Sequence, residues 1–269
     1  MREILAVSAA VVLALAVSPA AAQQYVDLEL ALAVDVSGSV DAEEAQLQRD
    51  GYIAAFRDPQ VVRAIEGGIL GRIAVSYYEW AGFGHIREIA GWTLIEDERT
   101  ANRFADLLTL NPPRTARRTA ISSAISFSVG YFEDNGFEGT RRVVDVSGDG
   151  ANNWGEPVTV ARDRAVAAGV TINGLPIVND RPGPGGWPQI RNLDLYYEHC
   201  VIGGPGAFIV VARSFREFAT AVRQKLITEI AGAAPPSPPR IIRVLKHGGP
   251  RLVPPCDVGE RRWLEDDDF

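Results

Sequence analysis

Three short polar stretches of the sequence contain side chains that suit a hard metal ion. Asp35, Ser37 and Ser39 follow an apolar run, and Asp149 follows a second one. Thr119 lies between them, at the expected start of a helix. Carboxylate and hydroxyl oxygens are hard donors that suit Mg²⁺, with Mn²⁺ or Ca²⁺ as competitors, and they do not suit zinc. Turn and capping chemistry is the alternative explanation of an isolated Asp-x-Ser-x-Ser pattern.

The elements that must position these residues alternate along the chain. Apolar stretches with strand character cover 25–34, 72–80, 85–95, 141–146, 170–178 and 207–212. Helical patterns cover 41–56, 98–110, 157–169 and 214–230, and a further helix opens at Thr119. This alternation predicts an α/β fold with a doubly wound, mostly parallel sheet and helices on both faces. The short Gly-containing link between the second and third stretches predicts a hairpin, hence one antiparallel edge strand.

The position of the polar stretches in this fold makes them candidates for a ligand-binding site. In a doubly wound sheet, ligands bind beyond the carboxyl ends of the strands, where the strand order reverses. Asp35 and Asp149 each follow a predicted buried strand. We therefore expect their side chains to meet at one edge of the sheet.

The chain divides into three predicted regions. Residues 1–22 contain an apolar run and a small-residue stretch that ends at Ala22, which is the layout of a cleaved signal peptide. An uncleaved anchor is the alternative, although the apolar run is short for a membrane span. Residues 24–232 form the α/β domain, and residues 233–269 form a Pro-rich linker and an irregular tail. We expect a periplasmic or secreted protein without membrane insertion after cleavage.

Composition excludes several function classes. The chain has 269 residues, with 27 Lys and Arg against 34 Asp and Glu, and a formal net charge of −7. Without a run of Lys and Arg, such a chain is a poor ligand for nucleic acid, because phosphate binding needs clustered cations. The two Cys and three His have no metal-ligand spacing, so no zinc site is expected. No Gly-x-Ser-x-Gly elbow of a hydrolase occurs.

The loop Asp35-Val36-Ser37-Gly38-Ser39, followed by an acidic helix, resembles the metal-ion-dependent adhesion site (MIDAS) of von Willebrand factor A (VWA) domains. The order of elements from about residue 25 to 232, including the early hairpin strand, is similar to that family. The resemblance implies a Rossmann-like VWA fold. Its nearest likeness is an exported bacterial branch of unknown function (DUF1194-like).

The resemblance also implies roles for individual residues. In the family, two Ser hydroxyls and a Thr from a second loop contact the metal, and two Asp act through water or as acceptors behind it. The roles fall on Ser37, Ser39, Thr119, Asp35 and Asp149. The turn that contains Asp149 is one residue longer than usual, and Arg118 stands where the family usually has Gly. Thr115 has a similar Arg-Thr-Ala context, but Thr119 is preferred because it directly precedes the helix.

A repeated pentapeptide gives Asp145 a separate interpretation. Val-Asp-Val-Ser-Gly occurs at 34–38 and again at 144–148. Aligning the two copies places Asp145 opposite Asp35, which predicts a group behind the metal ligands or a replacement for Asp149. An Asp at a strand end, paired with a nearby Arg, is the alternative.

Four further residues are expected to form a rim that contacts a partner. Arg117 and Arg118 directly precede Thr119, and Trp154 and Trp187 lie in loops on the predicted metal face. Arginines would attract an acidic partner, and aromatic side chains often anchor interfaces. A solvated loop and ordinary packing are the alternatives.

The resemblance implies a binding module without catalysis of its own. A Mg²⁺ held mainly by neutral hydroxyls stays electrophilic and leaves a coordination position open. An Asp or Glu carboxylate of a partner protein can fill that position. The alternatives are a Mg²⁺-dependent hydrolase of phosphoesters or esters, and a structural domain whose site binds no metal.

The two cysteines, Cys200 and Cys256, allow one disulfide. Exported proteins meet an oxidising compartment, where an even number of cysteines favours pairing. The bond would pin the tail to the domain and contribute on the order of 4 kcal/mol by the chain-entropy estimate. A buried Cys200 with a free or intermolecular Cys256 is the alternative, because sequence does not give the Cα separation that a disulfide needs.

Cleavage of the signal peptide gives a direct prediction. Mass spectrometry of the exported protein should show a new N-terminus at Gln23. A mature protein that retains Met1 would contradict the export interpretation.

Overall fold

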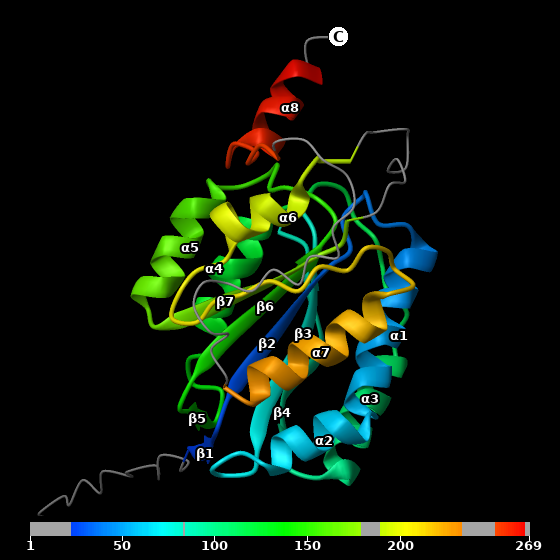
Figure 1. Ribbon diagram of the computed structural model, residues 1–269, viewed down its shortest axis with the longest axis vertical. Coiled ribbons are helices and arrows are strands. Elements are labelled where there is room, and N and C mark those ends of the chain that lie inside the picture. Colours follow the sequence, from blue (N-terminus) through cyan, green and yellow to red (C-terminus); the bar gives the residue numbers. More distant parts are fainter. Residues whose placement is uncertain (1–22, 83, 179–188, 233–250, 267–269) are drawn as a thin grey trace, which may run out of the picture.

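The centre of the fold is a five-stranded sheet (Figure 1). The computed structural model of the protein describes residues 23–82, 84–178, 189–232 and 251–266. The strands are β2 Glu29–Asp35, β3 Ile73–Trp80, β4 Ile86–Ile95, β6 Arg142–Gly148 and β7 Val170–Pro176. They lie in the order β4-β3-β2-β6-β7, with β4 antiparallel to β3 and all other neighbours parallel. The predicted mostly parallel sheet with one antiparallel edge strand is confirmed.

Helices cover both faces of this sheet, as predicted. One face carries α1 Ala42–Phe56, α2 Pro59–Glu66, α3 Glu98–Thr109 and α7 Phe218–Ile230. The other carries α4 Ile121–Tyr131, α5 Val158–Ala167, α6 Leu193–Tyr196 and the π-helix η1 Tyr197–Val201. Two short strands, β1 Gln24–Val26 and β5 Phe137–Gly139, pair in parallel at the opposite end from α8 Val258–Asp266 (Figure 1). None of the described helices is long and apolar enough to cross a lipid bilayer.

The central strand β2 is buried on both faces, which explains its almost continuous apolar sequence. Leu30, Leu32 and Val34 belong to the core beneath α1 and α7, whereas Ala31 and Ala33 face the side of α4 and α5. Full burial of a Leu or Val side chain stabilises the fold by about 1.5–3 kcal/mol. This strand therefore fixes where its last residue, Asp35, must lie.

The start of α1 determines where the loop after β2 ends. Asp41 accepts a hydrogen bond from the Glu44 main-chain nitrogen (2.8 Å), and the Glu44 carboxylate accepts one from the Asp41 nitrogen (3.1 Å). This is a capping box, and such an N-cap contributes about 1 kcal/mol.

Arg49 connects α1 to the segment that leads toward Thr119. Its guanidinium pairs with Glu79 on β3, and both side chains are buried. It also donates to the carbonyl oxygens of Leu108 (2.7 Å) and Asn111 (2.8 Å), which lie in the last turn of α3 and just after it. Arg49 thus satisfies carbonyl groups that the end of a helix leaves without partners.

The structure differs from the sequence expectation in several elements. Residues 207–212 form only isolated bridges with β7, because the Phe208 nitrogen donates to the Asn173 side chain (3.1 Å) instead of a strand partner. The helices α2, α6 and η1 were not predicted, since they are short or interrupt loop-like sequence. The tail, expected to be irregular, contains the helix α8.

The contact between α1 and α7 gives a test of the packing. A Cβ added to Gly51 would lie 2.8 Å from Phe218 Cδ1 and 3.3 Å from Ala219 Cα. Alanine adds about 1 kcal/mol of helix propensity, but overpacking costs about 1–3 kcal/mol. Gly51→Ala should therefore lower the free energy of unfolding in urea. The matched control is Gly130→Ala in α4, where no atom lies within 4 Å of the added Cβ; this variant should be neutral or stabilised, and equal behaviour of the two would contradict the packing.

Candidate functional site

Asp35 lies at the carboxyl end of β2 and is fully buried. Its Oδ1 accepts a hydrogen bond from the Ser37 main-chain nitrogen (2.7 Å), and its main-chain oxygen accepts one from the Gln48 side chain (3.1 Å). Among the described residues, no group donates a hydrogen bond to Asp35 Oδ2. A buried carboxylate oxygen without a donor is costly, so this atom calls for a cation or a proton.

The side-chain oxygens of the other predicted metal residues form a continuous chain. Ser37 Oγ lies 3.2 Å from Ser39 Oγ, and Thr119 Oγ1 donates to Ser37 Oγ at 3.1 Å. Ser39 Oγ in turn donates to Asp149 Oδ1 at 2.5 Å. The structure thus brings residues of the loop after β2, the turn before α4 and the loop after β6 into one oxygen cluster.

The turn that delivers Thr119 is held by main-chain hydrogen bonds. Ala116 N donates to Val36 O (2.9 Å), and Gly82 N donates to Arg118 O (2.7 Å). Arg118 has a φ of 71°, a left-handed conformation that favours glycine. Arg118 therefore holds a backbone conformation that a glycine would adopt without steric cost. Thr119 is buried in the cluster, whereas Thr115, the alternative considered from the sequence, is exposed.

Gly148 and Tyr197 belong to the site although the sequence analysis did not single them out. A Cβ added to Gly148 would lie 2.7 Å from Asp35 Oδ2 and 2.8 Å from the Tyr197 hydroxyl. Only a glycine leaves room for both groups. The Tyr197 hydroxyl is buried beside the cluster and has no hydrogen-bond partner within the described part of the chain.

Burial controls the protonation of these groups. It raises the pKa of Asp35 well above the ordinary value, and the charge of Asp149 raises this pKa further. Burial also raises the pKa of Asp149, while hydrogen bonds from Ser39 and Gln189 oppose the change. Burial, and then the charge of Asp35, raise the pKa of the Tyr197 hydroxyl. A cation between the two carboxylates would remove their repulsion and stabilise the ionised forms.

The chemistry of the donor set fits a hard divalent cation. Two carboxylates and three hydroxyls supply only oxygen, which Mg²⁺, Mn²⁺ and Ca²⁺ prefer. No group of three or more His, Cys, Asp or Glu able to hold a metal occurs in the described residues. Hydroxyls therefore have to supply most of the ligands if this cluster holds an ion.

Two asparagines, also missed from the sequence, join the loops that carry the cluster. Asn153 Oδ1 accepts a hydrogen bond from Thr119 N (2.8 Å), and Asn153 N donates to Thr119 O (2.8 Å). Asn152 Oδ1 accepts a hydrogen bond from Ser122 N (2.9 Å) in the first turn of α4. The only sequence signal was two adjacent amide side chains shortly after Asp149.

Asp145 does not lie in the cluster. It pairs across the sheet with Leu32, three residues before the end of β2, so the repeat alignment with Asp35 is wrong in space. Its carboxylate contacts Lys225 Nζ of α7 at 2.6 Å, and that lysine also pairs with Glu229. The partner is thus a buried lysine and not the arginine that the alternative interpretation expected.

Three of the four predicted rim residues, Arg117, Arg118 and Trp154, lie in loops near Thr119. Arg117 is exposed, and the Arg118 guanidinium carbon lies 5.0 Å from the ring centroid of Trp154. Trp154 is partly exposed beside this arginine. Trp187, the fourth predicted rim residue, lies outside the described residues.

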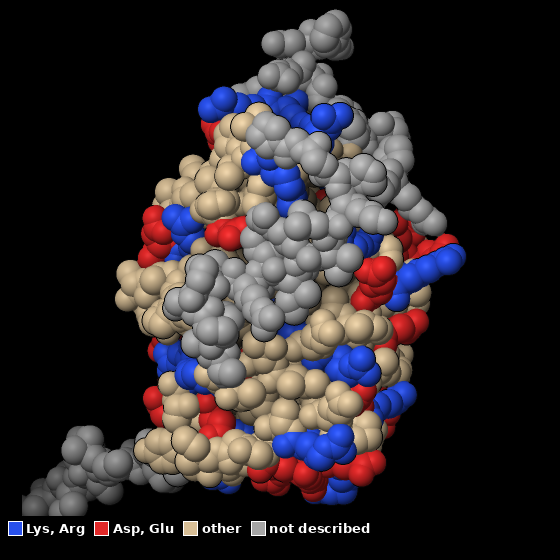
Figure 2. All heavy atoms as spheres, viewed as in Figure 1, with Lys and Arg blue, Asp and Glu red and all other residues tan. Residues whose placement is uncertain are grey.

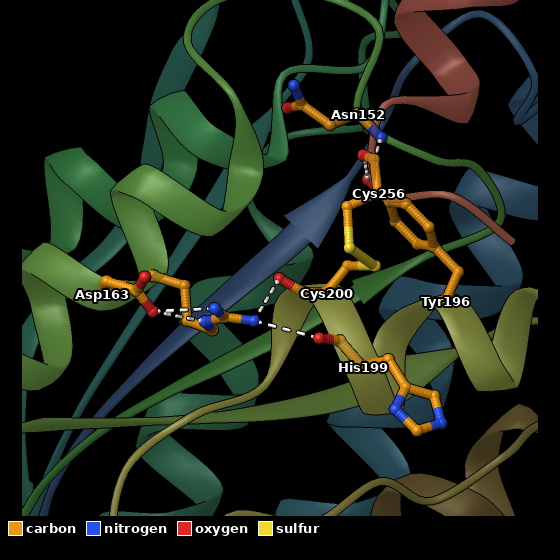
Figure 3. Close-up of a disulfide and its surroundings, with 7 residues drawn as sticks. Asn152, Asp163, Tyr196, His199, Cys200 and Cys256 are labelled. Carbon is orange, nitrogen blue, oxygen red and sulfur yellow. Dashed lines mark hydrogen bonds and ion pairs between the residues drawn. A yellow bond between two sulfur atoms is a disulfide. The ribbon is translucent and has the colours of Figure 1, made fainter. Parts of the chain in front are cut away.

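Cys200 and Cys256 form a disulfide, with a Cα separation of 5.4 Å (Figure 3). Cys200 is buried in η1, and Cys256 lies just before α8. The bond therefore attaches the C-terminal segment to the helical layer that also carries Tyr197.

Comparisons with known proteins agree with this fold. The profile of a family described as "Protein of unknown function (DUF1194)" matches residues 25–234. Among curated proteins, none matches the sequence significantly. Structural similarity is broader and includes a protein named von Willebrand factor type A from Catenulispora acidiphila, with a TM-score of 0.49 and 12% identity over 76% of this chain and 43% of that protein.

Two other solved structures are more similar in backbone. Proximal thread matrix protein 1 from the mussel byssus, with a zinc-occupied MIDAS motif, has a TM-score of 0.57 and 15% identity over 78% of this chain and 49% of its own. The pilus adhesin SpaC from Lactobacillus rhamnosus GG, in an open conformation, has a TM-score of 0.53 and 13% identity over 78% and 31%. The chain thus spans half or less of these neighbours. At these identities the similarity shows the VWA-like fold.

The pairing of Asp145 predicts a pH dependence of stability. Burial raises the pKa of Asp145 to about 7, although Lys225 opposes the change. Because the folded state holds this proton more tightly than the unfolded state, the stabilisation is complete below about pH 4 and is lost as the pH rises to about 7. Asp145→Asn should therefore flatten the fall in the free energy of unfolding between pH 4 and 7, measured by urea titration.

The residual slope of this variant should come from Asp35 and Asp149, whose pKa values are also raised. Asp163→Asn is the control, because that side chain is 69% exposed. An unchanged slope in Asp145→Asn would contradict the assignment.

Proposed function

The chain belongs to the DUF1194 family, and we propose that it is an exported, metal-dependent binding module with a MIDAS-like site. The cluster binds a divalent cation, Mg²⁺ first and Mn²⁺ or Ca²⁺ as competitors. Through that cation it binds an Asp or Glu carboxylate of a partner protein. Its function is adhesion-type recognition and not catalysis.

One observation carries the proposal: four oxygen-donor side chains from three loops gather at the buried carboxylate of Asp35. Asp35 Oδ2 has no donor in the described structure, and Ser37, Ser39 and Thr119 form a chain of hydroxyls that ends on Asp149. A purely structural domain gains nothing from two repelling carboxylates at one sheet edge. A cation supplies the positive charge that this arrangement lacks.

Each residue would have a defined part in holding the ion. Ser37, Ser39 and Thr119 offer neutral oxygens, and Asp35 and Asp149 offer negatively charged ones. Because most donors are neutral, the bound cation would keep much of its charge for an incoming acidic group. The main-chain bonds at Ala116 and Gly82 keep Thr119 in place for this task.

The surroundings of the site favour an acidic partner. Figure 2 shows Lys and Arg side chains gathered at the end of the molecule where Figure 1 places α8. Arg117 is exposed beside the turn that carries Thr119, whereas Arg261 of α8 pairs with Asp257, so Arg117 is the cation that we expect to attract an acidic group. Complementary charge of this kind steers association more than it adds affinity.

Two further observations support an exported binding protein. The Cys200–Cys256 disulfide is typical of proteins that reside in an oxidising compartment, such as the periplasm or the cell exterior. The neighbours are a byssus matrix protein and a pilus adhesin by name, which favours binding over the alternative of a hydrolase.

Metal binding is the first test. Ser39→Ala and Asp149→Ala should each weaken Mn²⁺ or Mg²⁺ binding, measured by calorimetry, by at least roughly 10- to 100-fold, since metal sites lose this much when even an outer partner is removed. Asp145→Asn and Ser126→Ala are controls that should bind as the unmodified protein does. Ser126 lies on α4, and its hydroxyl donates to Glu156 instead of to the cluster.

Binding of an acidic group is the second step of the same test. An array of acidic peptides should bind the protein when Mg²⁺ is present, and the protein should dissociate from the array after chelation of the metal. Arrays with Asn and Gln in place of Asp and Glu should not bind the protein. Tight metal binding by Ser39→Ala, or peptide binding that survives chelation, would overturn the proposal. Metal-dependent turnover of phosphoesters or esters would favour the hydrolase instead.

A further inference from the structure

The C-terminal segment 251–266 lies beyond the family match, which ends at residue 234, yet it packs against the loop after β6. We propose that this segment is a disulfide-held support that positions the loop carrying Asp149 and, through it, the turn carrying Thr119. The inference rests on the proposed function only where it concerns the metal.

Asn152 is the junction through which the support acts. Its Oδ1 accepts the hydrogen bond of Ser122 N in the first turn of α4, where the N-cap residue Ala120 offers no side-chain acceptor. Its Nδ2 donates to Glu156 O (3.2 Å) and to Glu260 Oε1 of α8 (2.8 Å). One amide side chain thus holds the start of α4 and α8 together.

The next residue carries the connection to the cluster. Asn153 exchanges two hydrogen bonds with Thr119, both 2.8 Å long. The turn with Thr119 therefore cannot move relative to Asn153 without breaking these hydrogen bonds. Since Asp149 begins this loop, displacement of Asn152 would disturb two of the expected metal loops together.

Close packing and a relay of hydrogen bonds fix α8 on Asn152. A Cβ added to Gly259 would overlap Asn152 O and lie 2.8 Å from its carbonyl carbon, so only glycine permits this approach. The Tyr196 hydroxyl accepts a hydrogen bond from Asn152 N (3.1 Å) and donates to Cys256 O (3.4 Å). Figure 3 shows Asn152, Tyr196 and Cys256 grouped beside the disulfide.

The disulfide keeps the segment in reach of this junction. Leu252 and Val253 are 77% and 47% exposed, so the first residues of the segment bury little apolar surface. Cys256 and Val258 pack at the edge of the core near α4 and α5. The bond to the buried Cys200 adds a covalent tether to this contact and holds the segment there through η1.

The experiment follows amide hydrogen exchange by NMR in the full chain without metal. Gly259→Ala pushes α8 away from Asn152, and Cys256→Ser removes its tether. We expect the Ser122, Thr119 and Asn153 amides to exchange at least tenfold faster in both variants, while those of Val144 and Val146 in β6 stay protected. Gly130→Ala, the matched glycine control, should make none of these amides exchange faster.

Mn²⁺ titration of the same variants completes the test. We expect both to bind Mn²⁺ severalfold more weakly than the unmodified chain. If Gly259→Ala fails to fold, as β6 exchange would reveal, Glu260→Ala replaces it, because it removes only the hydrogen bond to Asn152. Unchanged amide exchange at Ser122, Thr119 and Asn153 overturns the proposal that the segment positions these loops, whatever the Mn²⁺ titration shows. If the amides exchange faster in the variants but the unmodified protein binds no Mn²⁺, the supporting role of the segment is upheld and the proposed metal function is refuted.

Discussion

A carboxylate removed from water at the end of the central strand is the constraint on which the rest of the site depends. The core on both faces of β2 places Asp35 in full burial. Leaving a buried charge without a partner costs several kcal/mol. The surrounding loops answer part of this cost with one amide from Ser37 and a chain of hydroxyls, and they leave Asp35 Oδ2 without a donor among the described residues.

The same constraint dictates small and special backbone positions nearby. Gly148 lacks a side chain because the Asp35 carboxylate and the Tyr197 hydroxyl occupy the space where its Cβ would be. Arg118 adopts a left-handed conformation so that the next residue, Thr119, points into the cluster. A strained residue lowers the free energy of unfolding by about 1 kcal/mol. These positions carry that cost and bring three loops into contact.

The parts of the molecule that follow from local pattern could be predicted from the sequence, and those that depend on register could not. Buried strands followed by polar residues revealed the parallel sheet and the Asp35 and Asp149 loops. The repeat that suggested Asp145 failed because identical pentapeptides can stand three residues apart in register, which changes both the sheet face and the neighbours. Asn152 and Asn153 were missed because their partners lie about 30 residues away in the sequence, and such contacts produce no periodic pattern that could be recognised.

The position of Cys256 near the end of the chain has a consequence for the order of assembly. Chains are made from the N-terminus, so β2, α4 and β6 can pair before Cys256, Gly259 and Glu260 have emerged. The disulfide spans 56 residues of sequence and closes only after these residues have been made. The loop that carries Asp149 then receives its final contacts when the disulfide forms, so maturation of the site depends on oxidation as well as on folding.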